Sequence, residues 1–202
     1  MVSTSTVGGY KNINKTTVMF GLMKALVTGS QKPSFVVLDS AKGFEVRKYP
    51  PAKWVSTTEK NISHKAGTSA AFRRLFKYIQ GENQEKKTVP MTIPVTTKVE
   101  PGEGPNCESS FTMAFYLPVE HQERPPAPTD PALFVEDRPE LTVFVHTFGG
   151  FADDEKWVSH ALELSEAIGD QSQYISDFYY TVGYDAPFKL LNRTNEVWFV
   201  KK

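Results

Sequence analysis

The sequence predicts an α+β domain in which a curved antiparallel sheet carries two α-helices. Many short segments are rich in β-branched and aromatic residues and are separated by Gly, Pro and Asn, which is typical of antiparallel strands. Residues 63–79 and 153–168 have apolar side chains at the spacing of one helix face. The order of strands, one helix and a pair of strands occurs twice, over residues 34–118 and 133–200, which indicates two duplicated halves. The apolar helix faces are expected to cover one face of the sheet or fill its mouth.

The first half begins with three short strands, predicted at residues 34–38, 44–49 and 52–58. Residues 44–49 alternate apolar and polar side chains, as a half-buried strand does. A helix is predicted from Ser63 to Ile79, and it ends at Gly81, where a left-handed cap is common. Its apolar stripe follows the i, i+3, i+4, i+7 spacing and comprises Phe72, Leu75, Phe76 and Ile79.

The remaining strands are predicted from β-branched and aromatic content and from the breakers between them. They cover residues 89–99, 110–117, 133–137, 140–148, 179–184 and 196–200. Pro90 and Pro94 remove two hydrogen-bond donors from the first of these strands, so a bulge or an edge position is expected there. Residues 118–131 contain five prolines and are predicted to form a loop. Asp153 or Asp154 can accept backbone hydrogen bonds at the start of the second helix.

Composition narrows the classes of function. The chain of 202 residues has 23 basic and 23 acidic residues, and its formal net charge is zero. Proteins that bind nucleic acid by neutralising phosphates usually have a basic balance, so nucleic acid is not an expected partner. No apolar run is long enough to span a bilayer. The single cysteine, Cys107, cannot form an internal disulfide, which favours a reducing compartment such as the cytoplasm.

The chain is expected to divide into a tail at residues 1–33, with a short amphipathic segment, and one domain at residues 34–202. The tail is rich in Ser and Thr, and the first acidic residue of the chain is Asp39. This composition leaves open an organelle-targeting signal and an association with mitochondria. Transit peptides prefer Arg, and none precedes Arg47, so the alternative is a short helix that rests on the domain.

Known catalytic and metal-binding motifs are lacking in the sequence. It has no G-x-S-x-G elbow, no P-loop and no H-E-x-x-H helix, so a binding protein without enzymatic activity is expected. The histidines are scattered, and no pair has the spacing of a zinc motif, so no metal site is expected. They are His64, His121, His146 and His160.

Several motifs resemble the SOUL family of haem-binding proteins, and more closely its SOUL-type branch. The clearest is a C-terminal run, G-Y-D-x-P-x-K followed by N-R-x-N-E-x-W, at residues 183–198. Others occur in the family's order within residues 35–200, and include P-M-T-I-P-V at 90–95, the proline run at 125–128 and F-G-G-F at 148–151. The resemblance implies a distorted β-barrel of two duplicated halves flanked by two helices. It also implies non-covalent binding of haem or another tetrapyrrole, in the role of a carrier or buffer.

The expected ligand site is a shallow apolar cleft beside the first helix. A porphyrin has a flat apolar face and two carboxylates, so its site needs apolar lining and cations at the rim. Phe72 and Phe76 share one helix face and are candidate wall residues, although core packing explains the same spacing. Met91 can supply an adaptable thioether wall. By resemblance, Lys77 and Lys189 match positions proposed to meet the haem propionates.

Two positions depart from the family pattern. The SOUL-type branch is associated with an axial histidine just before the tyrosine of its second strand, and this chain has Lys48 there. Lysine is protonated near neutral pH, so Lys48 is a doubtful iron ligand unless a dry site lowers its pKa. Ser69 stands where the other branch carries an arginine proposed to contact a propionate. Affinity is therefore expected from apolar contacts and lysines rather than from iron coordination, and the axial ligand stays open.

The second helix offers an alternative function. Residues 162–170, L-E-L-S-E-A-I-G-D, resemble the BH3 segments that enter grooves of Bcl-2-type proteins, and the resemblance to the SOUL-type branch implies an apoptosis-related role. The alternative is thus a protein-interaction module with little tetrapyrrole binding. The spacing is imperfect, with three residues between Leu164 and Ile168, and packing on the sheet would already use the apolar stripe. A third alternative is an enzyme that acts on tetrapyrroles.

Overall fold

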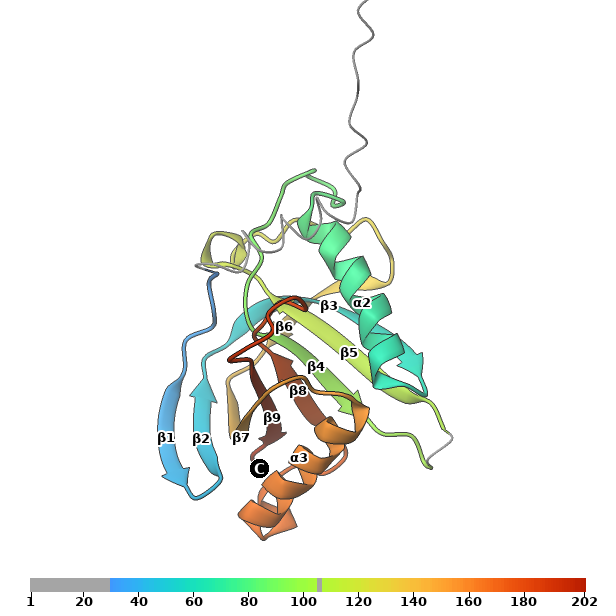
Figure 1. Ribbon diagram of the computed structural model, residues 1–202. Coiled ribbons are helices and arrows are strands. Elements are labelled where there is room, and N and C mark those ends of the chain that lie inside the picture. The colour runs from blue at the N-terminus through green and yellow to red at the C-terminus, as the bar shows by residue number, and fades with distance from the viewer. Residues whose placement is uncertain (1–29, 105–106) are drawn as a thin grey trace, which may run out of the picture.

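The computed structural model describes residues 30–104 and 107–202, which form a nine-stranded antiparallel sheet with two long helices on it (Figure 1). In chain order the elements are β1 (Val36–Ala41), β2 (Phe44–Tyr49), β3 (Ala52–Asn61), α2 (His64–Ile79), β4 (Val95–Glu100), β5 (Ser109–Tyr116), η1 (Val119–His121), β6 (Leu133–Arg138), β7 (Leu141–Gly149), α3 (Asp154–Ile168), η2 (Gln171–Gln173), β8 (Tyr179–Gly183) and β9 (Thr194–Val200). The sheet is curved and open, and its end strands are β1 and β6. The predicted α+β class and the curved-sheet form of the prediction are confirmed.

The strand order reflects the predicted duplication. The sheet runs β1-β2-β7-β9-β8-β4-β5-β3-β6. Apart from β1, reading inward from one end gives β2, β7, β9, β8, and from the other end β6, β3, β5, β4. Strands at the same place in the two series are equivalent: β2 with β6, β7 with β3, β9 with β5 and β8 with β4. They are equivalent because β2-β3-α2-β4-β5 and β6-β7-α3-β8-β9 follow the same order along the chain. Each copy has one strand in the other half of the sheet. The first copy's β2 pairs with the second copy's β7, and the second copy's β6 pairs with the first copy's β3.

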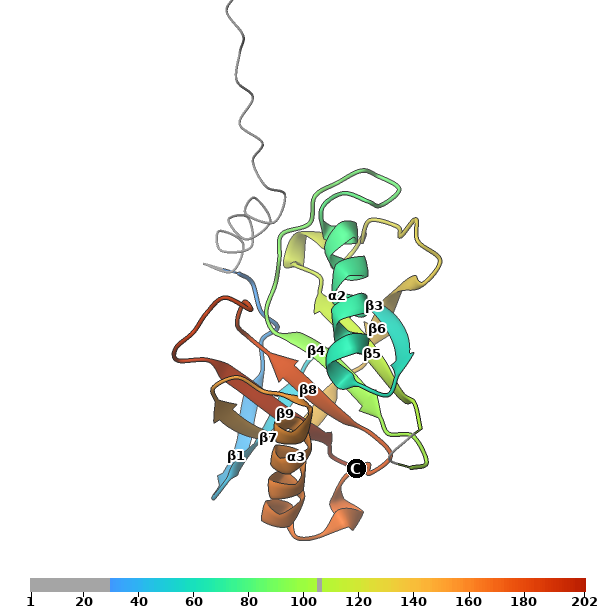
Figure 2. The same ribbon diagram turned by 45° about the vertical axis from the view of Figure 1, so that its right-hand side comes forward.

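The two halves of the sheet meet at one seam, where β4 pairs with β8 and Val95 lies opposite Gly183. On one side of the seam, α2 packs on β3 and β5; on the other side, α3 packs on β7 and β9. Both helices lie on the same side of the sheet, and the seam runs between them (Figure 2). The arrangement leaves the centre of this face uncovered by either helix.

Both long helices begin with a side-chain cap. The Ser63 hydroxyl accepts a hydrogen bond from the Ala66 N–H at the start of α2, and Asp153 accepts one from the Lys156 N–H at the start of α3. The sequence allows either Asp153 or Asp154 as the cap of this helix, and in the structure the cap is Asp153. Gly169 ends α3 in the left-handed region, with φ of 77°.

One predicted strand is too long. Residues 89–94 lie outside the sheet, and β4 begins only at Val95. The physical reason is that Pro90 and Pro94 have no N–H to donate to a neighbouring strand. Residues 89–94 instead run beside α2, where the Val89 N–H donates to the Ile79 carbonyl. The first strand is also displaced, because it spans residues 36–41 rather than 34–38.

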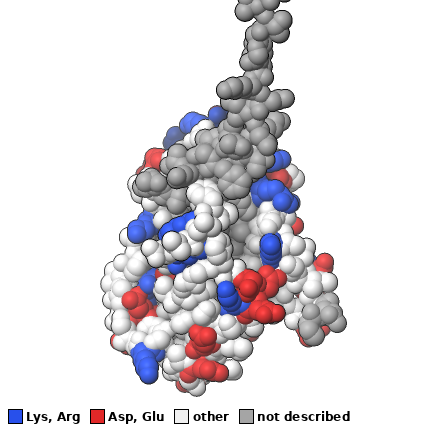
Figure 3. Space-filling view, viewed as in Figure 1, with Lys and Arg blue, Asp and Glu red and all other residues white. Residues whose placement is uncertain are grey.

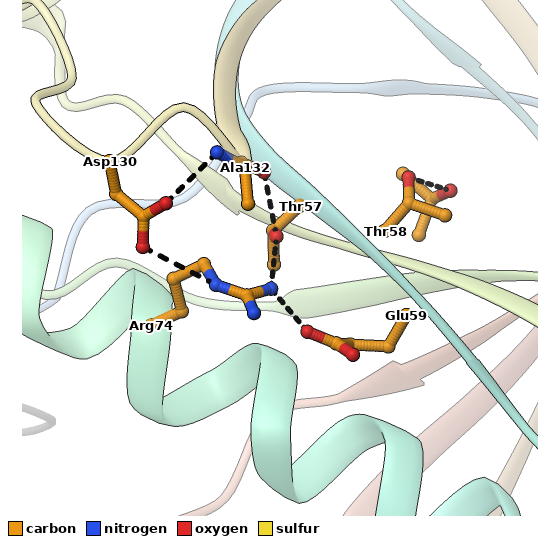
Figure 4. A network of polar contacts seen from close by, with 7 residues as sticks. Thr57, Thr58, Glu59, Arg74, Asp130 and Ala132 are labelled. Atoms are coloured by element: carbon orange, nitrogen blue, oxygen red, sulfur yellow. Dashed lines mark hydrogen bonds and ion pairs between the residues drawn. The ribbon is translucent and has the colours of Figure 1, made fainter.

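Arg74 fastens α2 to its surroundings (Figure 4). One guanidinium nitrogen, Nη1, donates to Thr57 Oγ1 at 2.8 Å and to the Glu59 carboxylate, both on β3. The Nε atom lies 3.4 Å from the carboxylate of Asp130, in the loop before β6. Thr57 in turn donates to the Ala132 carbonyl at 2.9 Å. One arginine thus joins the helix, the sheet and the proline-rich loop.

The predicted amphipathic segment falls on residues 1–29 and lies outside the described residues. Within the described residues, no helix has the length and apolarity needed to cross a membrane.

Candidate functional site

An apolar pocket opens at the seam beside α2. Its cavity volume is about 50 Å³. The lining comes from α2, from the segment before β4 and from the end of β8, and consists of Phe72, Phe76, Met91, Ile93, Val95, Gly183, Tyr184, Asp185, Ala186 and Pro187. Of the predicted site residues, the structure brings Phe72, Phe76 and Met91 together here. The sequence did not indicate Ile93, Val95 or the 183–187 segment as lining, because their approach depends on the pairing of β4 with β8.

Phe72 and Phe76 form the helical wall of this pocket. Their rings are stacked, with centroids 5.7 Å apart and planes 15° apart. Phe76 is buried, whereas Phe72 is half-buried and also packs edge-on against Phe115 of β5. The pair therefore packs in the core and also presents one side to the pocket, and its contact with a ligand stays a prediction.

A wider cleft adjoins the apolar pocket and has a volume of about 530 Å³. The two share Val95, Gly183 and Pro187, so they form one continuous hollow along the seam. The wider cleft lies between the N-terminal turns of α2 and α3, and its lining is mixed. It includes His64, Lys65, Thr68, Thr97, Met113, Phe151, Trp157, Thr181 and Arg193.

The floor of the hollow is open above Gly183. A Cβ atom built at Gly183 meets no heavy atom within 4 Å. Val95, its partner across the seam, is half-buried. A flat ligand could thus approach the backbone of β8 closely, as glycine permits.

Cations surround the hollow at different distances from it. The Lys189 ammonium lies 2.5 Å from the carboxylate of Asp185, which lines the apolar pocket. Arg193 lines the wider cleft, and its Nη1 donates to the Ala186 and Lys189 carbonyls at 2.8 Å each, which holds the 184–193 loop. Lys77 follows Phe76, is exposed, and forms no ion pair with the described residues.

Lys48 lies elsewhere. It is on β2, near the end of the sheet that carries β1, and its ammonium lies 2.7 Å from the Glu140 carboxylate. It lines neither part of the hollow. The structure therefore does not bring Lys48 together with Phe72, Phe76 and Met91.

A buried polar cluster supports the pocket loop. The Glu196 carboxylate accepts hydrogen bonds from Arg47 Nη1 at 2.9 Å, from the Tyr184 hydroxyl at 3.0 Å and from Trp198 Nε1 at 2.8 Å. Burial lowers the pKa of Arg47, but the neighbouring Glu196 carboxylate more than offsets this, and the net pKa is raised. Burial, with the Glu196 charge, also raises the pKa of Tyr184. Tyr184 is thereby fixed as a neutral wall residue of the pocket.

His64 is a neutral group at the wall of the wider cleft. Its ring packs edge-on against Phe111, with centroids 5.3 Å apart, and its Nε2 lies 3.1 Å from Thr181 Oγ1. Burial lowers its pKa to about 4, against the opposing effect of the Asp154 carboxylate. At neutral pH the cleft wall therefore carries an uncharged imidazole.

The apolar stripe of α3 is buried against the sheet. Trp157, Ala161 and Leu164 are buried against Phe148 and Phe199 of the sheet, among other residues. Presenting this stripe to a groove of another protein would require the helix to leave the core.

The chain matches proteins with named functions over most of its length. The family model described as "SOUL heme-binding protein" matches residues 30–200. "Heme-binding protein 2" of Homo sapiens is 43% identical over 160 residues, which cover 79% of this chain and 78% of that protein. "Heme-binding protein 1" of Xenopus tropicalis is 35% identical over 189 residues, covering 91% of this chain and 99% of the relative.

Solved structures with little sequence identity share the fold. The C-terminal domain of EcmrR has a TM-score of 0.55 at 10% identity, and the match covers 78% of this chain and 95% of that domain. An uncharacterised conserved protein from Listeria innocua has a TM-score of 0.51 at 11% identity, covering 90% and 98% of the two chains. The sequence motifs, the duplicated sheet and the match over residues 30–200 lead to one conclusion: this chain belongs to the SOUL heme-binding protein family.

Proposed function

We propose that this protein binds haem or a related tetrapyrrole non-covalently in the seam hollow and acts as a carrier or buffer. The observation that carries the proposal is the apolar pocket of Phe72, Phe76 and Met91 at the seam of a SOUL-family chain whose relatives are named for heme binding. Its zero net charge and single cysteine are consistent with such a role in a reducing compartment such as the cytoplasm.

The ligand would lie across both parts of the hollow. A volume of about 50 Å³ is far below the roughly 300–1,000 Å³ of sites that enclose a drug-sized molecule. The adjoining cleft adds about 530 Å³ and is reached over Gly183. One edge of the macrocycle would therefore contact Phe72 and Met91, while the rest would extend over the seam toward α3.

The carboxylates of the ligand would face the rim cations. The predicted rim residue Lys189 pairs with Asp185 of the pocket lining, and this carboxylate would have to share it with the ligand. Arg193, Lys65 and Lys156, which the sequence did not indicate, line the wider cleft and supply further positive charge. Asp153 and Asp154 also line it and offset part of this charge. Lys77 lies next to Phe76 on α2 and would serve only a ligand that extends past the helix face.

Iron coordination would add little to the affinity. In the apolar pocket, the buried Met91 thioether is a soft donor, and the Tyr184 hydroxyl already donates to Glu196. In the wider cleft, the neutral His64 imidazole already has its Nε2 3.1 Å from Thr181 Oγ1. Apolar contact would then supply most of the binding energy.

The lining of the hollow also favours binding over catalysis, because its carboxylates are engaged in the fold. Asp185 is held by Lys189 and by the Thr194 N–H, Asp153 caps α3, and Asp154 accepts from the Ser63 hydroxyl and the His64 N–H.

A titration with haem and with metal-free protoporphyrin IX tests the proposal. Both should bind at micromolar concentration with similar dissociation constants, and the Soret band of the haem complex should show no strong-field axial ligand. Failure of both porphyrins to bind would reject the proposal. A spectral change that continues after binding would instead indicate an enzyme acting on the tetrapyrrole.

A second candidate function is the binding of a protein partner at α3. It is supported only by the exposed Val158 and Leu162, one turn apart on the outer face, because the inner stripe is buried. Loss of a partner on Leu162→Asp, with porphyrin binding retained, would favour it.

A further inference from the structure

Three side chains with metal-binding atoms meet between α3 and β7. His146 projects from β7, and His160 and Glu163 project from consecutive turns of α3. His146 Nε2 lies 3.2 Å from His160 Nδ1 and 3.4 Å from Glu163 Oε2, and His160 Nδ1 lies 2.9 Å from the same oxygen. Among the described residues, these three form the only group of three or more such side chains that lie close enough together to hold one ion.

The spacing of these atoms matches that of a zinc coordination sphere. Zinc bonds to imidazole nitrogen at about 2.0–2.1 Å and to carboxylate oxygen at about 2.0–2.2 Å in a tetrahedral arrangement. Tetrahedral bonds of that length place neighbouring ligand atoms roughly 3.3–3.5 Å apart. The three separations in the structure are within a few tenths of an ångström of this value, so an ion would require only small side-chain movements.

Contacts with neighbouring residues already orient the two histidine rings for binding an ion. His146 Nδ1 lies 2.7 Å from the Gly43 carbonyl, which can only accept, so this nitrogen carries the proton and Nε2 keeps its lone pair. A metal-bound histidine ordinarily has this kind of outer partner. The His160 ring stacks on Phe148, with centroids 3.7 Å apart and planes 21° apart. Both rings are therefore held with a nitrogen toward the same point. His160 Nδ1 donates to the Glu163 carboxylate at 2.9 Å, so binding of an ion there would release this proton from Nδ1 and leave the ring protonated at Nε2.

The surroundings also favour a divalent cation. The Glu163 carboxylate supplies negative charge to the site. The His146 and His160 side chains are 17% and 21% exposed, whereas Glu163 is 53% exposed, so the site opens to solvent at the carboxylate. Figure 3 shows carboxylates gathered on the lower part of this face, over α3, whose acidic residues are Asp154, Glu155, Glu163 and Glu166.

We infer that His146 Nε2, His160 Nδ1 and Glu163 Oε2 bind a zinc ion or a similar late first-row divalent cation, with water in the fourth position. Two nitrogens and one oxygen suit such ions better than they suit calcium or magnesium, which prefer oxygen ligands. The ion would join α3 to β7 and, through Gly43, to the turn between β1 and β2. None of the three residues lines the seam hollow, so the inference does not depend on porphyrin binding.

Cobalt and zinc titrations of the chelator-treated full chain test this site. Co²⁺ should bind at one equivalent and give the visible absorption of a four-coordinate nitrogen and oxygen site, without thiolate charge transfer from Cys107. Zn²⁺ should displace it and compete with a chromophoric chelator. Absence of binding by the wild-type chain at 100 times the protein concentration would overturn the inference.

Variants locate the ion. His160→Gln and Glu163→Gln should each weaken Zn²⁺ binding by at least about 100-fold, the upper end of what loss of an outer partner costs. His121→Gln and Cys107→Ser should bind as the wild type does, because neither residue lies in the cluster. Equal affinity in wild type and Glu163→Gln would overturn the inference.

The melting temperature provides a second test, which does not depend on whether His160→Gln folds. Glu163 is exposed, so Glu163→Gln should fold. Because the ion binds the folded state, Zn²⁺ should raise the melting temperature of the wild type but not that of Glu163→Gln. Equal shifts in both would assign the zinc effect to another site and overturn the inference.

Discussion

The Arg47 guanidinium on β2 and the Glu196 carboxylate on β9 form a buried ion pair that reaches across the intervening strand β7, with Nη1 2.9 Å from Oε1. Both side chains are at most 10% exposed. Glu196 also accepts the Tyr184 hydroxyl, and Tyr184 lines the apolar pocket. The pair therefore links the packing of the sheet to the position of the pocket wall.

Removing the charge of Glu196 should destabilise the fold strongly. Glu196→Gln removes the buried counter-charge of Arg47 and leaves only the exposed Glu45 carboxylate beside the guanidinium among the described residues. Loss of a buried partner costs about 3–5 kcal/mol. Glu45→Gln is the matched control, because Glu45 contacts the same guanidinium at 2.8 Å but is 43% exposed, and it should cost less than about 1 kcal/mol. Urea denaturation compares the two free energies of unfolding; equal losses would contradict a dominant role for the buried partner.

Stability should decrease in mild acid because of His64. Its pKa is lowered from 6.5 to about 4 in the folded state, so the unfolded chain binds more protons between these values. Stability contributed by neutral His64 is thus present above pH 6.5 and is lost as the pH falls toward 4. The loss between pH 7 and pH 4.5 is about 2 kcal/mol. His64→Gln should remove this part of the pH dependence in urea denaturation, whereas His121→Gln should keep it.

Arg74 should stabilise the attachment of α2. Arg74→Met removes the hydrogen bonds to Thr57 and Glu59 and the contact with Asp130, at a cost of about 2 kcal/mol for charged hydrogen bonds that are partly exposed. Arg73→Met is the control on the same helix, because Arg73 is exposed. Thermal denaturation should show a lower melting temperature for Arg74→Met only, and equal melting temperatures would contradict the importance of the network.

A larger side chain at Gly183 should block the seam hollow without unfolding the protein. A Cβ there meets open space, so Gly183→Leu should fold and place its side chain over the floor shared by both parts of the hollow. We expect porphyrin affinity to fall at least about 10-fold, equivalent to 1.4 kcal/mol. Gly183→Ala should have a much smaller effect. Unchanged affinity in folded Gly183→Leu would show that the porphyrin binds elsewhere.

Charge reversal should separate the rim lysine from the distant one. Lys189→Glu places a carboxylate at the edge of the pocket and should weaken porphyrin binding about 5–10-fold, as expected for a solvent-exposed charge contact of about 1 kcal/mol. Lys48→Glu changes the net charge equally but lies on β2, so its affinity should match the wild type. A larger loss of porphyrin affinity in Lys48→Glu than in Lys189→Glu would show that Lys48 takes part in ligand binding.

The local patterns of the sequence were sufficient for most of the fold. Alternation in residues 44–49 and the apolar stripe ending at Ile79 are set by neighbours along the chain, and β2 and α2 match their predicted ranges closely. The prediction of a strand over residues 89–99 is wrong over residues 89–94. The β-branched content there favours a strand, but Pro90 and Pro94 have no N–H to donate to a neighbouring strand.

The site was predictable only where it lies within one element. Phe72 and Phe76 share a helix face, and that spacing is visible in the sequence. Val95 and Gly183 are neighbours only because β4 pairs with β8, and no local pattern indicates that register. The same limit applies to His146 and His160: their separation fits no zinc motif, and the packing of α3 on β7 brings them together.

The exchange of strands between the two copies has a consequence for how such a protein could arise. Cutting the chain in the proline-rich loop would leave each fragment without the strands that complete its sheet, because β2 needs β7 and β6 needs β3. Two identical ancestral fragments could satisfy the same pairings only as an intertwined homodimer. The hollow lies at the β4–β8 junction, where the dyad of that dimer would pass, so in such a dimer both copies would contribute to its walls.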